Sequence, residues 1–213
     1  MKDIGNVMIL GDSYSTFEGC IPDGYTAYYT TAPGDNTDVC KAEQTWWHQV
    51  ICNTRSNLLL NCSWSGTTVC HTGWGGVDIA DHSFVGRFEE LESDGYFERN
   101  KIDTFFIFGA TNDSWADSPL GELMYDGQTK EDLYKVLPAI CYLIKRAKQV
   151  LPETRVICIL NTELKDEISD CFAKACEKYD AELLRLQHID KCSGHPTIKG
   201  MAQIAEQVTE FLG

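Results

Sequence analysis

Five short apolar segments recur along the chain, and longer segments with helical periodicity separate them. The apolar segments are rich in β-branched and aromatic residues and run continuously instead of alternating with polar residues, a pattern typical of strands covered on both faces. Such strands belong to parallel sheets, whose crossover connections are usually helices. The predicted strands are residues 7–10, 58–62, 104–108, 155–160 and 182–186.

The segments between these strands carry apolar residues at i, i+3 and i+4 spacing, which indicates amphipathic helices. We expect a kink at Pro138, inside the second of these helices. The alternation of strand and helix favours a parallel sheet with right-handed crossovers and helices on both faces. No repeat or linker divides the chain, so we interpret residues 1–213 as a single domain. The predicted helices are residues 43–53, 131–150, 166–178 and 198–212.

The balance of charges narrows the range of partners. The chain contains 18 Lys and Arg residues against 32 Asp and Glu residues, which gives a formal net charge of −14. Binding to nucleic acid or to an anionic membrane surface draws on clustered cations, so this charge disfavours both. No segment reaches the roughly 18 apolar residues that a membrane span requires. We therefore expect a small-molecule or carbohydrate partner; the sequence does not indicate the oligomeric state.

The ten cysteines show neither a CxxC motif nor the Cys/His spacing of a structural zinc site. Several, such as Cys62, Cys141 and Cys158, lie in apolar segments, where a free thiol packs as a small hydrophobic group. The N-terminal segment lacks the apolar core and the cleavage site of a signal peptide. We therefore expect reduced thiols, no metal and a cytoplasmic location; a signal peptide removed before residue 1 would instead indicate secretion.

Polar segments follow the predicted strands where each strand ends. Ser13 follows the first strand, Gly66 the second and Asn112 the third, while His195 precedes the last helix. Because the carboxyl ends of parallel strands meet at one edge of a sheet, we expect these residues to converge. A nucleophile, small-residue backbone donors, a side-chain amide and a histidine suffice for acyl transfer. Two loops, 19–40 and 66–82, are long enough to indicate a function.

These blocks resemble those of the SGNH (GDSL) hydrolase superfamily. The blocks are Gly11-Asp12-Ser13, Gly66, Gly109-Ala-Thr-Asn112-Asp113 and His195-Pro196, and their order and spacing cover nearly the whole chain. The resemblance implies a flavodoxin-like three-layer α/β/α sandwich with a five-stranded parallel sheet. It also implies an esterase or lipase-like reaction that needs no metal or organic cofactor.

The resemblance also implies a role for each matching residue. Ser13 would be the nucleophile, and His195 would be the general base that deprotonates it and returns a proton to the leaving alcohol. The backbone N–H groups of Ser13 and Gly66, together with the side-chain amide of Asn112, would form the oxyanion hole. Asp12 is interpreted as a structural carboxylate of the turn.

One position departs from the family pattern. The family has an Asp three residues before the His, where this chain has Cys192. Asp190 could reach the far nitrogen of His195, or a backbone carbonyl could orient the imidazole and leave a Ser–His dyad. A Cys192 thiolate is a third possibility, although a thiol is a weak acceptor until it ionises. All three remain open at this point.

Three tryptophans, Trp64, Trp74 and Trp115, flank the predicted oxyanion residues. Their rings could line a pocket for an acyl chain, stack on a sugar or simply pack under the loops. Together with the acidic charge, they favour a serine hydrolase that removes an O-acetyl group from a carbohydrate through an acyl-enzyme intermediate. A short-chain lipid esterase or general carboxylesterase is the alternative within the same class. A non-catalytic binding module with a degenerate site is the alternative from a different class.

Overall fold

The five apolar segments form one all-parallel sheet in the computed structural model of the protein, which describes residues 3–213. The spatial order of the strands is β2-β1-β3-β4-β5, the order of flavodoxin-like doubly wound sheets. The order reverses between β1 and β3, so the crevice beyond their carboxyl ends is where a ligand site is expected. The strands are β1 (Asn6–Gly11), β2 (Asn57–Ser63), β3 (Thr104–Gly109), β4 (Arg155–Leu160) and β5 (Glu182–Arg185).

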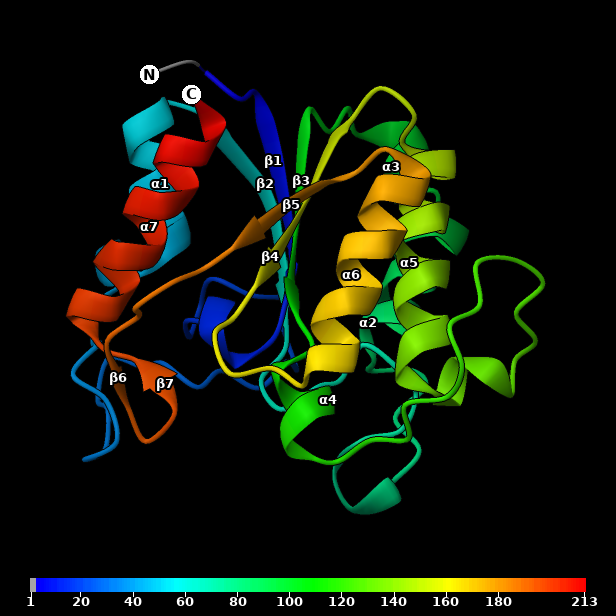
Figure 1. Ribbon diagram of the computed structural model, residues 1–213. Coiled ribbons are helices and arrows are strands. Elements are labelled where there is room, and N and C mark those ends of the chain that lie inside the picture. Colours follow the sequence, from blue (N-terminus) through cyan, green and yellow to red (C-terminus); the bar gives the residue numbers. More distant parts are fainter. Residues whose placement is uncertain (1–2) are drawn as a thin grey trace.

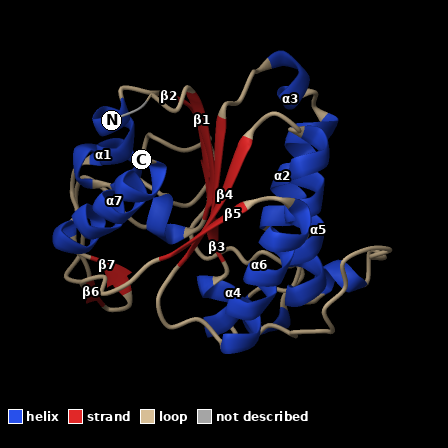
Figure 2. Cartoon of the chain, turned by 45° about the horizontal axis from the view of Figure 1, so that its top comes forward, coloured by secondary structure: helices blue, strands red, loops and turns tan. Residues whose placement is uncertain are grey.

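Helices cover both faces of the sheet, which confirms the predicted three-layer sandwich (Figure 1). One face is covered by α1 (Trp46–Thr54) and α7 (Ile198–Leu212). The other is covered by α2 (Phe84–Ser93), α5 (Val136–Val150) and α6 (Asp166–Tyr179), and Figure 2 shows the sheet between the two helical layers. The short helices are α3 (Tyr96–Arg99) and α4 (Thr111–Trp115).

The core consists of two apolar clusters, one on each face of the sheet. Successive side chains of a strand point to opposite faces, so Leu10 and Ile107 pack toward α5 whereas Ile9 and Phe106 pack toward α1 and α7. All six residues of β3 are buried. Each large apolar side chain buried in this way stabilises the fold by about 1.5–3 kcal/mol. Six of the ten free cysteines are buried in the first cluster.

Two helices differ from their predicted form. The helix predicted over residues 131–150 is a 3₁₀ turn at Asp132–Tyr134 followed by α5. The kink predicted at Pro138 is wrong, because this proline lies in the first turn of α5, where a backbone N–H has no partner within the helix. Helix α2 was not predicted, because Gly86 and Arg87 interrupt its apolar pattern.

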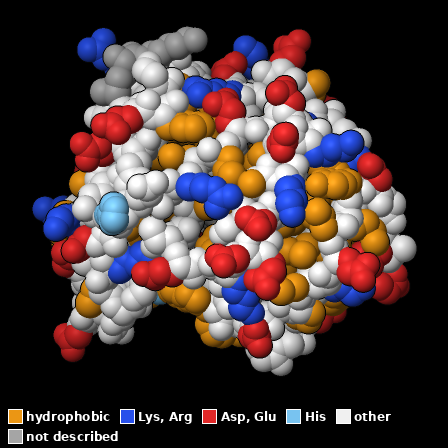
Figure 3. Space-filling view, in the orientation of Figure 1, with side chains coloured by type: hydrophobic (Ala, Val, Ile, Leu, Met, Phe, Trp, Pro, Cys, Tyr) orange, Lys and Arg blue, Asp and Glu red, His pale blue; other side chains and the backbone are white. Residues whose placement is uncertain are grey.

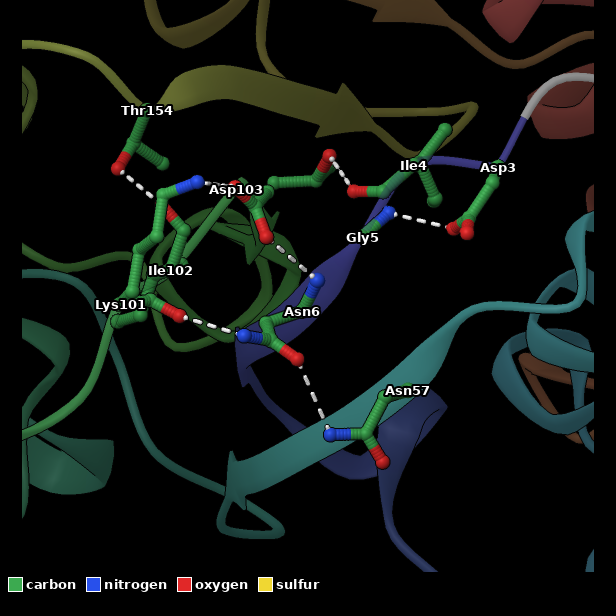
Figure 4. A network of polar contacts seen from close by, with 10 residues as sticks. Asp3, Ile4, Gly5, Asn6, Asn57, Lys101, Ile102, Asp103 and Thr154 are labelled. Carbon is green, nitrogen blue, oxygen red and sulfur yellow. Dashed lines mark hydrogen bonds and ion pairs between the residues drawn. The ribbon is translucent and has the colours of Figure 1, made fainter.

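The opposite edge of the sheet, where the strands begin, is closed by hydrogen bonds around Asn6 (Figure 4). The backbone N–H of Asn6 donates to Oδ2 of Asp103 at 2.9 Å, and its side-chain amide donates to the carbonyl of Lys101 at 3.0 Å. Its Oδ1 accepts from Nδ2 of Asn57 at 3.2 Å. Polar groups at this edge therefore bond to one another, whereas those described below converge at the opposite edge.

Acidic and basic side chains are interspersed over the face of the molecule shown in Figure 3. Over the molecule as a whole, several charged side chains form ion pairs, such as Lys145 with Asp126 at 2.5 Å. Exposed pairs of this kind contribute about 0–1 kcal/mol each, so they serve solubility more than stability. None of the helices within residues 3–213 combines the length and the apolar character needed to cross a membrane.

The contact of Gly86 with the preceding loop leads to a test of the α2 packing. A Cβ atom at this position would lie 1.8 Å from the carbonyl oxygen of Ala80, which is backbone and cannot move away freely. Although Ala is normally the better helix former, we expect Gly86→Ala to lower the free energy of unfolding by at least about 2 kcal/mol. Urea denaturation would measure this loss. In the matched control Gly34→Ala the Cβ meets open space, so a comparable loss in both variants would contradict the explanation.

Candidate active site

Ser13 lies in a tight turn at the carboxyl end of β1. Asp12 caps the 3₁₀ turn Ser13–Ser15, because its Oδ1 accepts the backbone N–H of Tyr14 at 3.0 Å. The carbonyl of Ser13 accepts the backbone N–H of Thr16 at 3.3 Å and the hydroxyl of Thr16 at 3.0 Å. The Ser13 side chain is thereby presented on a rigid turn at the sheet edge.

His195 reaches Ser13 from a small antiparallel hairpin formed by β6 (Lys191–Cys192) and β7 (His195–Pro196). The two loop residues, Ser193 and Gly194, have φ values of 49° and 80°. Two positive φ values are the signature of the type I′ turn, whose twist matches that of paired strands. The hairpin places Nε2 of His195 3.0 Å from Oγ of Ser13. A nucleophile and a base at hydrogen-bond distance form the central pair of a serine hydrolase site.

The far nitrogen of His195 contacts the backbone. Its Nδ1 lies 3.3 Å from the carbonyl oxygen of Ser193, two residues earlier. Because a carbonyl only accepts, Nδ1 carries the hydrogen and Nε2 is left with a lone pair directed at Ser13. Among the three possibilities left open by the sequence, this geometry is that of the Ser–His dyad.

The structure does not bring Asp190 to His195. Its Oδ2 accepts the hydroxyl of Thr197 at 2.5 Å, and its Oδ1 lies 3.9 Å from Nζ of Lys199. Since Thr197 is the N-cap residue of α7, the carboxylate is held at the start of that helix. Within residues 3–213, no hydrogen bond or ion pair joins Asp190 and His195. Cys192 is exposed and pairs with His195 across the hairpin through the backbone register.

The surroundings of His195 favour its neutral form. Burial lowers the pKa of the imidazole, the Ser193 carbonyl opposes this effect, and the positive charge of Lys191 adds to it. A neutral imidazole near neutral pH can accept the proton of a serine hydroxyl.

Gly66 and Asn112 lie at the ends of the two strands that flank β1 in the sheet. Gly66 has a φ of 82°, in the left-handed region that glycine adopts without strain. Within the described part of the chain, the backbone N–H groups of Ser13 and Gly66 donate no hydrogen bond. Both donors therefore stay free for a ligand oxygen.

The side-chain amide of Asn112 is held in a defined orientation. Its Nδ2 donates to the carbonyl of Thr67 at 3.0 Å, and its Oδ1 accepts from Nε1 of Trp74 at 3.3 Å. One amide hydrogen is thus used for positioning, and the second is free to donate. Asn112 lies in α4, and the N-cap residue of this helix, Ala110, has a φ of 70°. A positive φ is uncommon for a residue with a Cβ atom and is typical of functional sites.

Arg87 of α2 is a component that the sequence analysis missed. Its side chain is fully buried, and its guanidinium bonds to the ends of β1 and β2 and to the loops that follow β2. Nη2 donates to the carbonyl of Gly11 at 3.2 Å and to the hydroxyl of Thr67 at 3.0 Å. Nη1 donates to the carbonyl of Cys62 and Nε to that of His82. The only signal in the sequence is a lone cation between apolar residues.

Two carboxylic acids, Asp12 and Asp113, are fully buried. Burial raises the pKa of Asp12 to about 7; the charge of Asp113 adds to this shift, and that of Arg87 opposes it. Burial also raises the pKa of Asp113 to about 6, although two backbone N–H groups of the loop after β2 favour its charged form. Oδ2 of Asp12 has no hydrogen-bond partner within residues 3–213. Asp12 caps a turn, so its interpretation as a structural carboxylate agrees with its contacts.

The three flanking tryptophans occupy different positions. Trp74 is 48% exposed beside Asn112, and Trp115 packs edge-on against the ring of His195 with 5.9 Å between centroids. Trp64 stacks on Tyr25 with 4.1 Å between centroids. The structure therefore brings Trp74 and Trp115 to the residues around Ser13, while Trp64 packs within the loops.

The whole chain is similar to known proteins of one family. Residues 5–212 match the sequence profile of the family described as GDSL-like Lipase/Acylhydrolase. A crystal structure from Bacteroides ovatus, provisionally named a GDSL-like lipase, is 43% identical and covers 99% of both chains with a TM-score of 0.91. A protein from Bacteroides uniformis with the same provisional name is also 43% identical, with a TM-score of 0.90, over 98% of this chain and 95% of that one.

A structure of lower sequence identity also shares the fold. An acetyl xylan esterase from Butyrivibrio proteoclasticus is 18% identical, with a TM-score of 0.65, over 100% of this chain and 64% of that one. No curated protein matches the chain.

The buried carboxyl of Asp12 should make stability depend on pH. Between about pH 4 and pH 7 the folded state holds a proton that the unfolded state has released, so this residue lowers the free energy of unfolding as the pH rises. Asp12→Asn cannot ionise and keeps the acceptor for Tyr14. We expect the free energy of unfolding of Asp12→Asn, taken relative to that of wild type, to rise by about 2–4 kcal/mol from pH 4 to pH 8.

Urea unfolding at several pH values would measure this gain. The control is Asp94→Asn, which removes an exposed carboxylate. A difference between Asp12→Asn and wild type that stays constant across the pH range would contradict the prediction.

Proposed function

Because this chain belongs to the GDSL-like lipase/acylhydrolase family and is an ester-hydrolysing enzyme, we propose that it removes acetyl groups from carbohydrates through an acyl-enzyme intermediate on Ser13. The observation that carries the proposal is the 3.0 Å contact between Oγ of Ser13 and Nε2 of His195. Beside it lie two free backbone donors and an oriented side-chain amide.

In the first step, Oγ of Ser13 attacks the ester carbonyl carbon while Nε2 of His195 accepts the hydroxyl proton. The carbonyl oxygen becomes an oxyanion. It receives hydrogen bonds from the N–H groups of Ser13 and Gly66 and from the free amide hydrogen of Asn112. The tetrahedral intermediate collapses as the imidazolium gives its proton to the leaving alcohol, and the acyl group stays on Ser13.

In the second step, water takes the place of the alcohol. Nε2 of His195 accepts a proton from the water as it attacks the acyl carbon, and the same donors stabilise the second oxyanion. The proton then returns to Oγ of Ser13, and the carboxylic acid leaves. During both steps the imidazolium donates from Nδ1 to the carbonyl of Ser193, which supplies the partner that a carboxylate supplies in a triad.

Two observations support a carbohydrate ester as the substrate. Trp74 presents an exposed ring beside the amide of Asn112, and flat aromatic rings stack well on sugars. The net charge of −14 opposes anionic substrates such as phospholipids. The fold resembles that of an acetyl xylan esterase, although at 18% identity this likeness concerns the fold alone.

Replacement of the nucleophile tests the reaction. We expect wild type to hydrolyse p-nitrophenyl acetate and Ser13→Ala to lose at least about 10³-fold in kcat/KM, because no other group can form the acyl-enzyme. The control Ser169→Ala removes a hydroxyl from α6 and should retain activity. Equal inertness of wild type and Ser13→Ala across an ester panel would indicate a non-catalytic binding module.

The same assay tests the substrate class. Acetate esters should be cleaved faster than octanoate esters, and wild type should release acetate from acetylated xylan. A preference for octanoate, with no release from xylan, would instead identify the second candidate, a lipid esterase or general carboxylesterase. The provisional names of the two structures that are 43% identical favour this second candidate.

Replacement of Asp190 distinguishes the dyad from a triad. Since its carboxylate bonds to Thr197 and not to His195, we expect Asp190→Asn to keep kcat/KM within about threefold of wild type, far from the roughly 10⁴-fold loss that follows removal of a true triad carboxylate. Steady-state kinetics on p-nitrophenyl acetate would measure this. A loss of orders of magnitude in a folded variant would show that Asp190 orients His195 during turnover.

A further inference from the structure

Tyr28 lies flat against the imidazole of His195. Their ring centroids are 3.6 Å apart and their planes differ by 8°, the closest of the ring contacts around this histidine. Tyr14 lies tilted at 5.5 Å and Trp115 edge-on at 5.9 Å. One whole face of the imidazole is therefore covered by Tyr28, which restricts rotation of the ring out of its plane.

The segment that carries Tyr28 is tied to the turn of the nucleophile. The backbone N–H of Tyr28 donates to Oγ1 of Thr16 at 2.9 Å, and the same hydroxyl donates to the carbonyl of Ser13 at 3.0 Å. The contacts thus form a closed ring that passes from Ser13 to Thr16, Tyr28 and His195. The ring closes through the 3.0 Å contact between Nε2 of His195 and Oγ of Ser13. A shift of the imidazole relative to Oγ would disturb this ring.

Two more tyrosines hold the backbone on either side of His195. The hydroxyl of Tyr14 donates to the carbonyl of Gly194 at 2.5 Å, and the hydroxyl of Tyr29 donates to the carbonyl of Pro196 at 3.0 Å. Both tyrosines are fully buried. The hydroxyl of Tyr28, by contrast, makes a single hydrogen bond within the described residues, to the carbonyl of Asn36 at 3.5 Å, so the ring face of Tyr28 is its main contact with the site.

The stack also affects the charge of the imidazole. The face of an aromatic ring attracts a cation, so Tyr28 stabilises the imidazolium that forms when His195 takes the proton of Ser13. Among residues 3–213, the other groups that face this imidazole offer no carboxylate: Lys191 is cationic, Tyr14 is neutral because burial raises its pKa, and Cys192 is the hairpin partner. In the same part of the chain, the carbonyl of Ser193 is the one hydrogen-bond partner of Nδ1.

From these contacts we propose that Tyr28 is a positioning residue that shares with the Ser193 carbonyl the two tasks of the missing carboxylate, orientation of His195 and stabilisation of its cation. Tyr14 and Tyr29 fix the hairpin on which His195 stands. This inference rests on the proposed function of the Ser13–His195 pair. It explains how a dyad with one long backbone contact keeps its base aligned.

The key variant is Tyr28→Leu, which keeps an apolar side chain over the imidazole and removes the ring. We expect kcat on p-nitrophenyl acetate to fall at least about 10-fold while KM changes less than about twofold, because the lost interaction acts on the transition state. Since the imidazolium loses its stabilising ring, the pKa of His195 should fall in the pH profile of kcat/KM. Tyr28→Phe keeps the ring and should restore most of the activity lost in Tyr28→Leu.

Tyr96→Leu is the matched control, because Tyr96 is half-buried in α3 at the opposite edge of the sheet and packs edge-on against Phe97. It should leave both kcat and the pKa of His195 unchanged. Three outcomes would overturn the proposal: activity of Tyr28→Leu within twofold of wild type, an equal loss in Tyr28→Phe, or a loss with an unchanged pKa of His195. The last would indicate a structural role only.

An NMR titration of the His195 ring protons in the unliganded protein separates this proposal from the proposed function. A lower pKa of His195 in Tyr28→Leu than in wild type and Tyr28→Phe would support the stack even if wild type hydrolyses none of the esters tested. An active wild type whose His195 titrates identically in all three proteins would overturn the role of Tyr28 and leave the function standing.

Discussion

The site depends on one buried cation. The guanidinium of Arg87 donates to backbone carbonyls near the carboxyl ends of β1 and β2 and to the hydroxyl of Thr67, next to Gly66. One side chain therefore joins the segments that carry the proposed nucleophile and one proposed oxyanion donor. A buried charge is costly unless all its donors are satisfied. Here backbone carbonyls provide most of the acceptors, and the nearby carboxyl of Asp12 adds opposite charge when it is ionised.

The sheet and the convergence of the site could be predicted from the sequence because both follow from local patterns. Continuous apolar runs identify strands buried on both faces, and parallel strands place whatever follows them at one edge. Ser13 and Asn112 follow neighbouring strands, so their proximity is a matter of topology. The sequence also placed His195, 182 positions after Ser13, at this edge, and the resemblance to a family gave the two residues their expected roles.

The features that escaped prediction are those determined by tertiary contact. Gly86 lies in α2 where the carbonyl of Ala80 leaves no room for a side chain. Arg87, the next residue, donates to the backbone carbonyl of Gly11 at the end of β1. Neither contact can be read from the sequence of the helix itself. The partner of His195 was left open because it depends on the backbone of Ser193 in a two-residue hairpin. Pro138 marked the beginning of a helix where the pattern indicated a kink within one.

The ring of contacts around His195 has a consequence for how the protein becomes active. The proposed nucleophile, the proposed oxyanion donors and the three tyrosines all precede the hairpin in sequence. The hairpin itself docks through its contacts with Ser13, Tyr14, Tyr28 and Tyr29. Such long-range contacts form late, after the loops between them have closed. Hydrolytic competence is therefore a property of the finished tertiary structure. Undocking of the β6–β7 hairpin would therefore abolish ester hydrolysis while the sheet stayed folded.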